Sequence, residues 1–217
     1  MSVRSNETSP PKRRVPTQAR SRRRVEGILD AAERLVVQHG VDALTTRDIA
    51  EAAAVPVASL YQYFADKEGV LLALAERDMA EMDTQVAEDL AQVEDLTVAS
   101  MVRSVMTSFV EVYHRRPGFV EIYLRGRTNV AVHEFGREHN ARVAGDLRQF
   151  ALDAGIADSS LTPKVAQLAV EVGDRVFQIA FEKADRGDET LIEEGIAMMT
   201  AYLERHATPA GLTGTVR

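Results

Sequence analysis

Residues 45–68 contain closely spaced hydroxyl, guanidinium and ammonium groups. These groups donate hydrogen bonds, which phosphate oxygens and the edges of bases accept. Thr46 offers a hydroxyl and a backbone amide at the start of an expected helix, where a phosphate binds readily. Arg47 can reach a phosphate or a guanine edge, or it can pair with Glu51 four residues further on. Lys67 opens another expected helix, where its charge opposes the helix dipole and a nearby phosphate would stabilise it. This chemistry indicates contact with a nucleic acid.

Between these donors lie small side chains and an amide side chain, which can contact the edges of bases. Gln62 can pair with adenine, and small apolar groups fit the methyl group of thymine. The residues expected to read bases are Val57, Ala58, Ser59 and Gln62.

Two short helices joined by a tight turn must position these groups. The first, residues 45–53, begins at a threonine pair that can cap it and carries small apolar residues on one face. The second, residues 57–63, begins after Pro56, whose missing N–H costs least at a helix start. This spacing predicts a helix-turn-helix, whose second helix enters the major groove while the first crosses the phosphate backbone.

This stretch closely resembles the DNA-binding signature of the TetR family of transcriptional regulators. The matching residues are Thr45-Thr46, Ile49-Ala50 and Leu60-Tyr61-Gln62-Tyr63-Phe64-Ala65-Asp66-Lys67-Glu68. The motif match spans residues 25–72, and beyond it the resemblance is one of architecture. It implies a regulator that binds double-stranded operator DNA as a homodimer and is released by a small-molecule effector, with repression the family's usual mode. It also implies that Tyr61 and Tyr63 contact phosphate, although a packing role for one of them is the alternative.

Two positions depart from the family pattern. Ala54 stands where the turn commonly has Gly, and if the position is left-handed the alanine costs roughly 1 kcal/mol. Pro56 stands where a Ser or Thr often caps the recognition helix, so the cap hydrogen bond is lost, although proline's fixed φ partly compensates.

Helical periodicity continues to the end of the chain, and no segment alternates as a strand would. We expect an all-α fold in which a three-helix head joins a larger helical bundle. The nine expected helices lie near residues 25–40, 45–53, 57–63, 66–90, 97–114, 119–125, 129–153, 162–184 and 188–205. The expected domains are a disordered basic arm (1–18), a DNA-binding domain (19–66), a ligand-binding and dimerisation domain (67–206) and a flexible tail (207–217).

The charge of the chain is distributed unevenly. The net charge is −7, from 26 basic and 33 acidic residues. Residues 1–24 hold eight basic residues and one acid, which leaves 18 basic and 32 acidic residues in the remainder. This asymmetry predicts a cationic arm on an acidic body. The arm either adds affinity for DNA or serves only as a solvated tail.

Aromatic and methionine side chains in the body can line an adaptable cavity for a small, mainly hydrophobic ligand. The expected lining residues are Met106, Phe109, Tyr113, Tyr123, Phe150 and Phe177. Ordinary core packing is the alternative for each of them. The family resemblance places such a ligand between the helices at 66–90 and 162–184.

The helices at 162–184 and 188–205 are too apolar to face water on every side. In the TetR family these two helices pair with their copies in a dimer, although a monomer could bury the same stripes internally. The expected interface residues are Val172, Val176, Ile179, Ile196, Met199 and Leu203.

The sequence argues against an enzyme. Cysteine is absent, and no phosphate loop, nucleophile elbow or paired-carboxylate motif is present. The cluster of His133, Glu134, Glu138 and His139 fits no common metal spacing, so we expect neither a metal nor a cofactor. No apolar stretch reaches the ~20 residues of a membrane span and no apolar run follows the basic N-terminus, so the expected location is the cytoplasm. The remaining alternative function is a ligand-independent structural or activator protein of the same fold.

Overall fold

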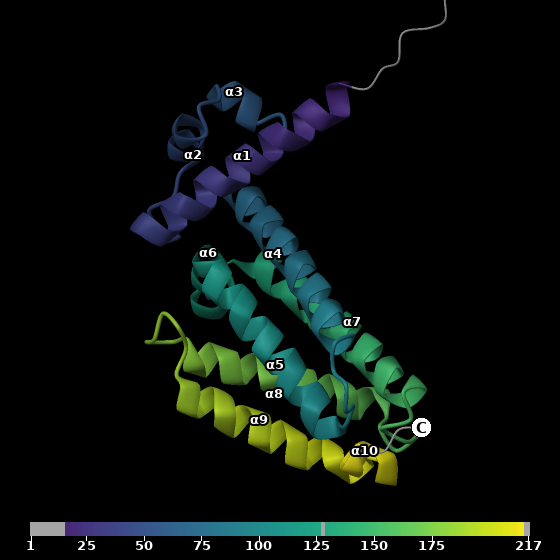
Figure 1. The fold of residues 1–217 in the computed structure, drawn as a ribbon. Coiled ribbons are helices and arrows are strands. Elements are labelled where there is room, and N and C mark those ends of the chain that lie inside the picture. The colour runs from purple at the N-terminus through teal and green to yellow at the C-terminus, as the bar shows by residue number, and fades with distance from the viewer. Residues whose placement is uncertain (1–15, 127–128, 215–217) are drawn as a thin grey trace, which may run out of the picture.

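The computed structural model of the chain describes residues 16–126 and 129–214. These residues are mainly helical and form no strand, apart from one isolated antiparallel bridge between Ala157 and Ala207. A small three-helix head lies at one end of a larger body, and the long helix α4 runs from the head into the body (Figure 1). The all-α architecture predicted from the sequence is confirmed.

The head comprises α1 (Pro16–His39), α2 (Thr46–Ala52) and α3 (Val57–Leu60). The body comprises α4 (Lys67–Leu90), α5 (Val98–Arg115), α6 (Pro117–Phe119), the π-helical turn η1 (Val120–Arg125), α7 (Val130–Asp153), α8 (Pro163–Ala180), α9 (Glu189–Leu203), the 3₁₀ turn η2 (Glu204–His206) and α10 (Pro209–Thr213). Each predicted helix has a counterpart, with the sixth divided between α6 and η1, and α10 is an addition.

Side-chain caps explain why several helices begin where they do. The hydroxyl of Thr45 accepts a hydrogen bond from the backbone N–H of Asp48 at 3.2 Å, and the carboxylate of Asp66 accepts one from Gly69 at 2.8 Å. Thr97 and Ser100 form a reciprocal capping box at the start of α5. Each such cap contributes about 1 kcal/mol by satisfying an amide that the helix leaves unpaired.

Helix α1 begins earlier than its apolar stripe indicates. The stripe starts at Val25, but the helix starts at Pro16, so residues 16–18 are helical and do not belong to a disordered arm. Proline is favourable at a helix start, which explains this boundary. The rest of the predicted arm, residues 1–15, lies outside the described residues.

The C-terminal segment is ordered where the sequence predicts a flexible tail. The backbone N–H of Thr208 donates to the carbonyl of Ile156 at 3.0 Å, and its hydroxyl donates to the carbonyl of Gly155 at 2.6 Å. A Cβ on Gly211 would lie 2.0 Å from the same Ile156 oxygen, so only glycine permits this approach. Contacts with a segment about fifty residues earlier in the chain therefore hold the start of this segment.

Helix α8 ends at Ala180, whereas its sequence pattern continues to Ala184. The carbonyl of Ala180 accepts a hydrogen bond from the N–H of Asp188 at 2.9 Å, and the carbonyl of Phe181 accepts one from Arg125 Nε at 2.8 Å. These tertiary partners replace the helical hydrogen bonds that residues 184 and 185 would have donated to the same two carbonyls.

One hydrophobic core cluster extends from the head into the body along α4. Ile28 of α1 and Leu60 of α3 are fully buried, as are Leu71 and Leu74 of α4. Met82, two turns further along α4, belongs to the same cluster. The head and the body are thus joined by continuous packing, and a shift of α4 must disturb both.

Candidate DNA-binding surface and interior cavity

The turn between α2 and α3 has the geometry that a helix-turn-helix needs. Ala54 has a φ of +52°, so this turn position is left-handed, the conformation in which alanine costs stability. The N–H of Ala54 donates to Glu51, and the N–H of Val55 donates to Ala50 at 2.9 Å, which closes the end of α2. Ile49, Ala50 and Leu60 are fully buried beneath the turn.

Replacing Ala54 by Gly should leave the chain as stable as before or up to about 1 kcal/mol more stable. Removing the Cβ relieves roughly 1–2 kcal/mol of left-handed strain, while the added freedom of the unfolded chain costs roughly 0.5–1 kcal/mol. Urea unfolding measures the difference. Ala53→Gly is the matched control, because Ala53 has a right-handed φ of −83° and should lose stability. Equal losses in the two variants would contradict the expectation.

Helix α3 presents a row of side chains to solvent. Val57, Ala58 and Gln62 are exposed and Ser59 is half-buried, so the four residues expected to read bases lie on or next to an open surface. The regular helix ends at Leu60, and Gln62 follows in a tighter turn in which its N–H donates to the carbonyl of Ser59 at 3.3 Å.

Two phenols connect α3 to its neighbours. The Tyr61 hydroxyl lies 3.0 Å from the Thr46 hydroxyl, which places both oxygens together where α2 and α3 meet. The Ser21 hydroxyl of α1 donates to the Tyr63 hydroxyl at 3.4 Å. Tyr61 is 52% exposed, whereas Tyr63 is half-buried against the core. A phosphate-contacting role is therefore more accessible to Tyr61, and Tyr63 has the environment of the packing alternative.

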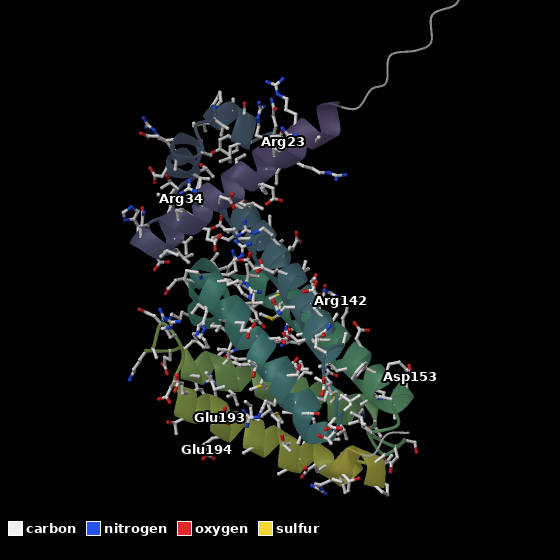
Figure 2. All side chains as sticks on the ribbon, viewed as in Figure 1. Arg23, Arg34, Arg142, Asp153, Glu193 and Glu194 are labelled. Atoms are coloured by element: carbon white, nitrogen blue, oxygen red, sulfur yellow. The ribbon has the colours of Figure 1, made fainter. Side chains whose placement is uncertain are left out.

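Basic side chains surround this surface. Arg47 is exposed and forms no ion pair with Glu51, although both residues are described. Lys67 begins α4 and likewise has no acidic partner within 4.0 Å among the described residues. Helix α1 adds four arginines that the sequence pattern had assigned to the arm or to its edge, and none of them is in an ion pair within the described part of the chain: Arg20, Arg22, Arg23 and Arg24. Figure 2 shows Arg23 on the head, far from the acidic Glu193 and Glu194 of α9.

An ionic cluster connects the head to the body, and no sequence motif indicated it. Arg77 of α4 donates to Asp30 of α1 at 2.9 Å, to Glu33 of α1 at 2.7 Å and to its neighbour Asp78 at 2.9 Å. We call Asp30, Glu33, Arg77, Asp78, Glu81 and Arg116 the junction cluster.

Arg116, at the end of α5, extends the junction cluster into the body. It donates to Glu81 of α4 at 2.8 Å and to Glu33 of α1 at 3.4 Å. Asp78 is fully buried at its centre, and its Oδ2 accepts no hydrogen bond from the described residues. Burial raises the pKa of Asp78 to about 6, against the opposing charge of Arg77. The junction cluster therefore joins α1, α4 and the end of α5 through ion pairs, and separating these charges would cost free energy.

An apolar cavity of about 90 Å³ lies in the body between α5, α7, α8 and α9. Met106, Phe109 and Phe177, three of the six residues expected to bind a ligand, line it, and the rings of Phe109 and Phe177 stack at 5.6 Å. Arg148 and Asp174 are the charged residues of its wall. None of the lining residues of this cavity belongs to α4.

The other three predicted ligand residues lie elsewhere. Tyr113 packs in an aromatic cluster with Phe119 and Phe181, and Tyr123 stacks on Phe119 at 5.3 Å. Phe150 lines a separate groove of about 360 Å³ between α4, α5 and α7. Periodicity placed all six residues on inward faces but could not indicate which interior space each face meets.

The predicted dimer residues divide in the same way. Ile179 is 43% exposed, and Val172 and Val176 are half-buried. Ile196 and Met199 are buried within the single chain and Leu203 is half-buried, and Met199 and Leu203 line the cavity. The apolar residues that α8 and α9 do expose are Leu168, Ile179, Leu191 and Met198.

The histidine cluster has ordinary partners. His133 Nε2 lies 2.7 Å from the carbonyl oxygen of Gly126, and His139 Nε2 lies 2.7 Å from the Asp83 carboxylate. No group of three potential ligands is placed to hold a metal within the described ranges. In the same part of the chain, no helix has both the length and the apolar character needed to cross a membrane.

Comparison with known proteins agrees with this geometry. Residues 28–74 match the family model of bacterial regulatory proteins of the tetR family, and residues 97–203 match a tetracyclin repressor-like C-terminal domain. A TetR-family transcriptional regulator from Streptomyces coelicolor is 32% identical, with a TM-score of 0.69, and the alignment covers 84% of this chain and 99% of that one.

Curated relatives match about a third of the chain. The transcriptional repressor AcnR of Corynebacterium diphtheriae is 39% identical over 69 residues, and that of Corynebacterium glutamicum is 37% identical over 62. These alignments cover 32% and 29% of this chain and about a third of each relative, 36% and 33%. The chain belongs to the TetR family of bacterial transcriptional regulators, which bind DNA and are not enzymes.

Proposed function

We propose that this chain is a repressor that binds an inverted-repeat operator as a homodimer and leaves it when a small, mainly apolar effector binds the body. The observation that carries the proposal is the exposed row on α3, flanked by Thr46, Tyr61 and the unpaired cations Arg47 and Lys67. The curated relatives named as repressors support the direction of regulation.

The contacts of α5 suggest how an effector would act on the head. Met106 and Phe109 of α5 line the cavity, and Arg116 at the end of α5 holds Glu81 of α4 and Glu33 of α1. An effector that displaces α5 would therefore move Arg116 and change its contacts with Glu81 and Glu33 in the junction cluster. Since α4 is 24 residues long, about 36 Å at 1.5 Å per residue, a small tilt changes the spacing of the two recognition helices.

The test begins with selection of the bound DNA from a random pool. We expect an inverted repeat whose half-sites are centred about 34 Å apart, one helical turn of DNA. Effector affinity should then be measured with and without this operator. Linkage requires the operator to weaken effector binding by the factor by which the effector weakens operator binding. Equal effector affinities would contradict release, and they would favour the ligand-independent structural or activator alternative.

Replacing Lys67 by Ala should weaken binding to all DNA sequences about equally. The reason is that a phosphate contact carries no base preference, and its loss should lower the slope of log affinity against log salt by about one. Changing Gln62 should instead alter the preferred base at one position of each half-site. Lys164→Ala on α8 is the matched control and should change neither property. An unchanged salt dependence for Lys67→Ala would exclude the docking described here.

A further inference from the structure

The interior cavity holds a carboxylate without a cationic partner. Asp174 of α8 lines the cavity, whose wall is otherwise apolar except for Arg148. No Lys, Arg or His nitrogen among the described residues lies within 4.0 Å of the Asp174 carboxylate. Asp174 is half-buried, and a carboxylate partly withdrawn from water is as a rule paired with a cation or held by several hydrogen bonds, because desolvating an ion is costly.

The partners of Asp174 are neutral donors. Gln178 Nε2 donates to Asp174 Oδ2 at 2.7 Å, and the Tyr123 hydroxyl also donates to this carboxylate. Arg175 does not reach Asp174, since it donates instead to the Gln178 amide oxygen at 2.9 Å. Burial raises the pKa of Asp174, while the hydrogen bonds from Tyr123 and Gln178 lower it. Two hydrogen bonds thus orient the carboxylate, and no described residue forms an ion pair with it. The more distant charges of Glu171 and His133 raise and lower its pKa, respectively.

Arg148 cannot supply the missing charge. Its Nε donates to the carbonyl of Leu161 at 2.6 Å, at the end of the cavity where Ala166 of α8 also lines the wall. Asp174 is eight residues further along α8 than Ala166, which corresponds to about 12 Å at 1.5 Å per residue. The two charged residues therefore lie towards opposite ends of the cavity, with apolar side chains between them.

The wall next to Asp174 suits an organic cation. Phe177 follows one helical turn later and stacks with Phe109 at 5.6 Å, so a cation beside Asp174 would also meet aromatic faces. Gly173 leaves space there, because the nearest atom to a Cβ at that position would be Met106 Sδ at 3.7 Å.

We propose that the cavity binds an organic cation, a protonated amine on an apolar body, with the ammonium group on Asp174 and the apolar body between Phe109, Phe177 and Met106. The inference rests on the proposed effector site and names its ligand class. At about 90 Å³ the cavity is smaller than the roughly 300–1,000 Å³ typical of ligand pockets, so it must expand.

Flexible side chains can provide this expansion. Met101, Met106 and Met199 line the cavity, and methionine adapts its shape at low cost. Phe109 and Leu147 line both the cavity and the groove of about 360 Å³ beside it, so rotation of these two side chains would join the spaces.

The experiment compares n-hexylammonium, 1-hexanol and hexanoate, three probes of equal chain length, by calorimetry on the full chain. We expect the ammonium to bind about 10- to 100-fold more tightly than the alcohol, as a charge-assisted hydrogen bond to a desolvated carboxylate provides. Asp174→Asn should abolish that preference. Glu194→Gln on α9 is the control, because it removes an exposed acid that does not line the cavity.

Three results would overturn the inference: tighter binding of hexanoate than of hexylammonium, no binding of hexylammonium, or a preference that persists in Asp174→Asn. The comparison of the three probes on the unaltered chain decides the matter even if Asp174→Asn does not fold. Operator release is measured separately. Selective binding of the ammonium without release would overturn the proposed function alone, and release by neutral or anionic compounds only would overturn this inference alone.

Discussion

Replacing Arg77 by Met is expected to lower the free energy of unfolding by about 3–5 kcal/mol, a large part of the stability of a typical domain. The side chain of Arg77 is only 16% exposed, and it holds Asp30, Glu33 and the buried Asp78. Methionine preserves the aliphatic packing but leaves three carboxylates without their shared cation. Urea unfolding at pH 7.5 provides the measurement.

Arg103→Met is the matched control. Arg103 binds Glu193 with two hydrogen bonds of 2.9 Å, but the side chains are 56% and 59% exposed, so the pair should contribute at most about 1 kcal/mol. Similar losses in the two variants would show that the junction cluster has no special role in holding the head to the body.

The deficit of Arg77→Met should also depend on pH. The folded-state pKa of Asp78, about 6, is above its ordinary value, so protonation stabilises the fold, and that stabilisation is lost as the pH rises through 6. Removing Arg77 takes away a charge that lowers this pKa, so the pKa should rise further. The deficit should therefore shrink as the pH falls from the raised pKa of Asp78 in the variant to about 6, below which Asp78 is protonated in both proteins. Asp78→Asn in the same background should restore part of the stability at pH 7.5.

A charge on the exposed face of α8 and α9 is expected to abolish dimerisation. Ile179→Glu or Met198→Glu would bury a carboxylate in the proposed interface, whereas in the single chain these side chains are 43% and 49% exposed. We expect folded monomers whose operator affinity is about 10²- to 10⁴-fold lower. The reason is that, in a dimer, binding of one subunit to its half-site holds the other subunit close to the second half-site, and a monomer loses this advantage. Sedimentation and DNA titration measure the two effects.

Val130→Glu is the control for these variants, because it places the same charge on an exposed apolar residue of α7, outside the proposed interface. Val130 is 69% exposed, and its substitution should leave both the assembly and the operator affinity unchanged. Variants of Ile179 and Met198 that stay dimeric with full operator affinity would place the interface on another face.

Local features of this protein were determined by the sequence itself. Helix starts at Thr45, Asp66 and Thr97 could be predicted because a cap acts on amides two or three residues away. The left-handed turn at Ala54 could be predicted because the motif fixes its distance from both helices. The DNA-binding surface follows from such local geometry, since the head is formed by neighbouring short segments.

The interior of the body could not be predicted in the same way. Periodicity places Tyr113, Phe150 and Phe177 on inward faces, but only Phe177 lines the cavity. Helical spacing determines which face is apolar and leaves open which helix covers it. The same holds for Ile196 and Met199, because an apolar stripe on a helix can pack against a partner chain or against the core of its own chain.

The tertiary structure alone decided the contacts between segments far apart in the chain. Arg77 joins Glu33 across 44 residues, and Thr208 joins Gly155 across 53. Asp174 looks in the sequence like a surface acid between apolar residues, and only the packing of α7 and α8 makes it part of a cavity wall. A charged or polar group acquires such a role from its hydrogen-bond and ion-pair partners and from its loss of contact with water on folding. The residues next to it in the chain determine neither its partners nor its burial.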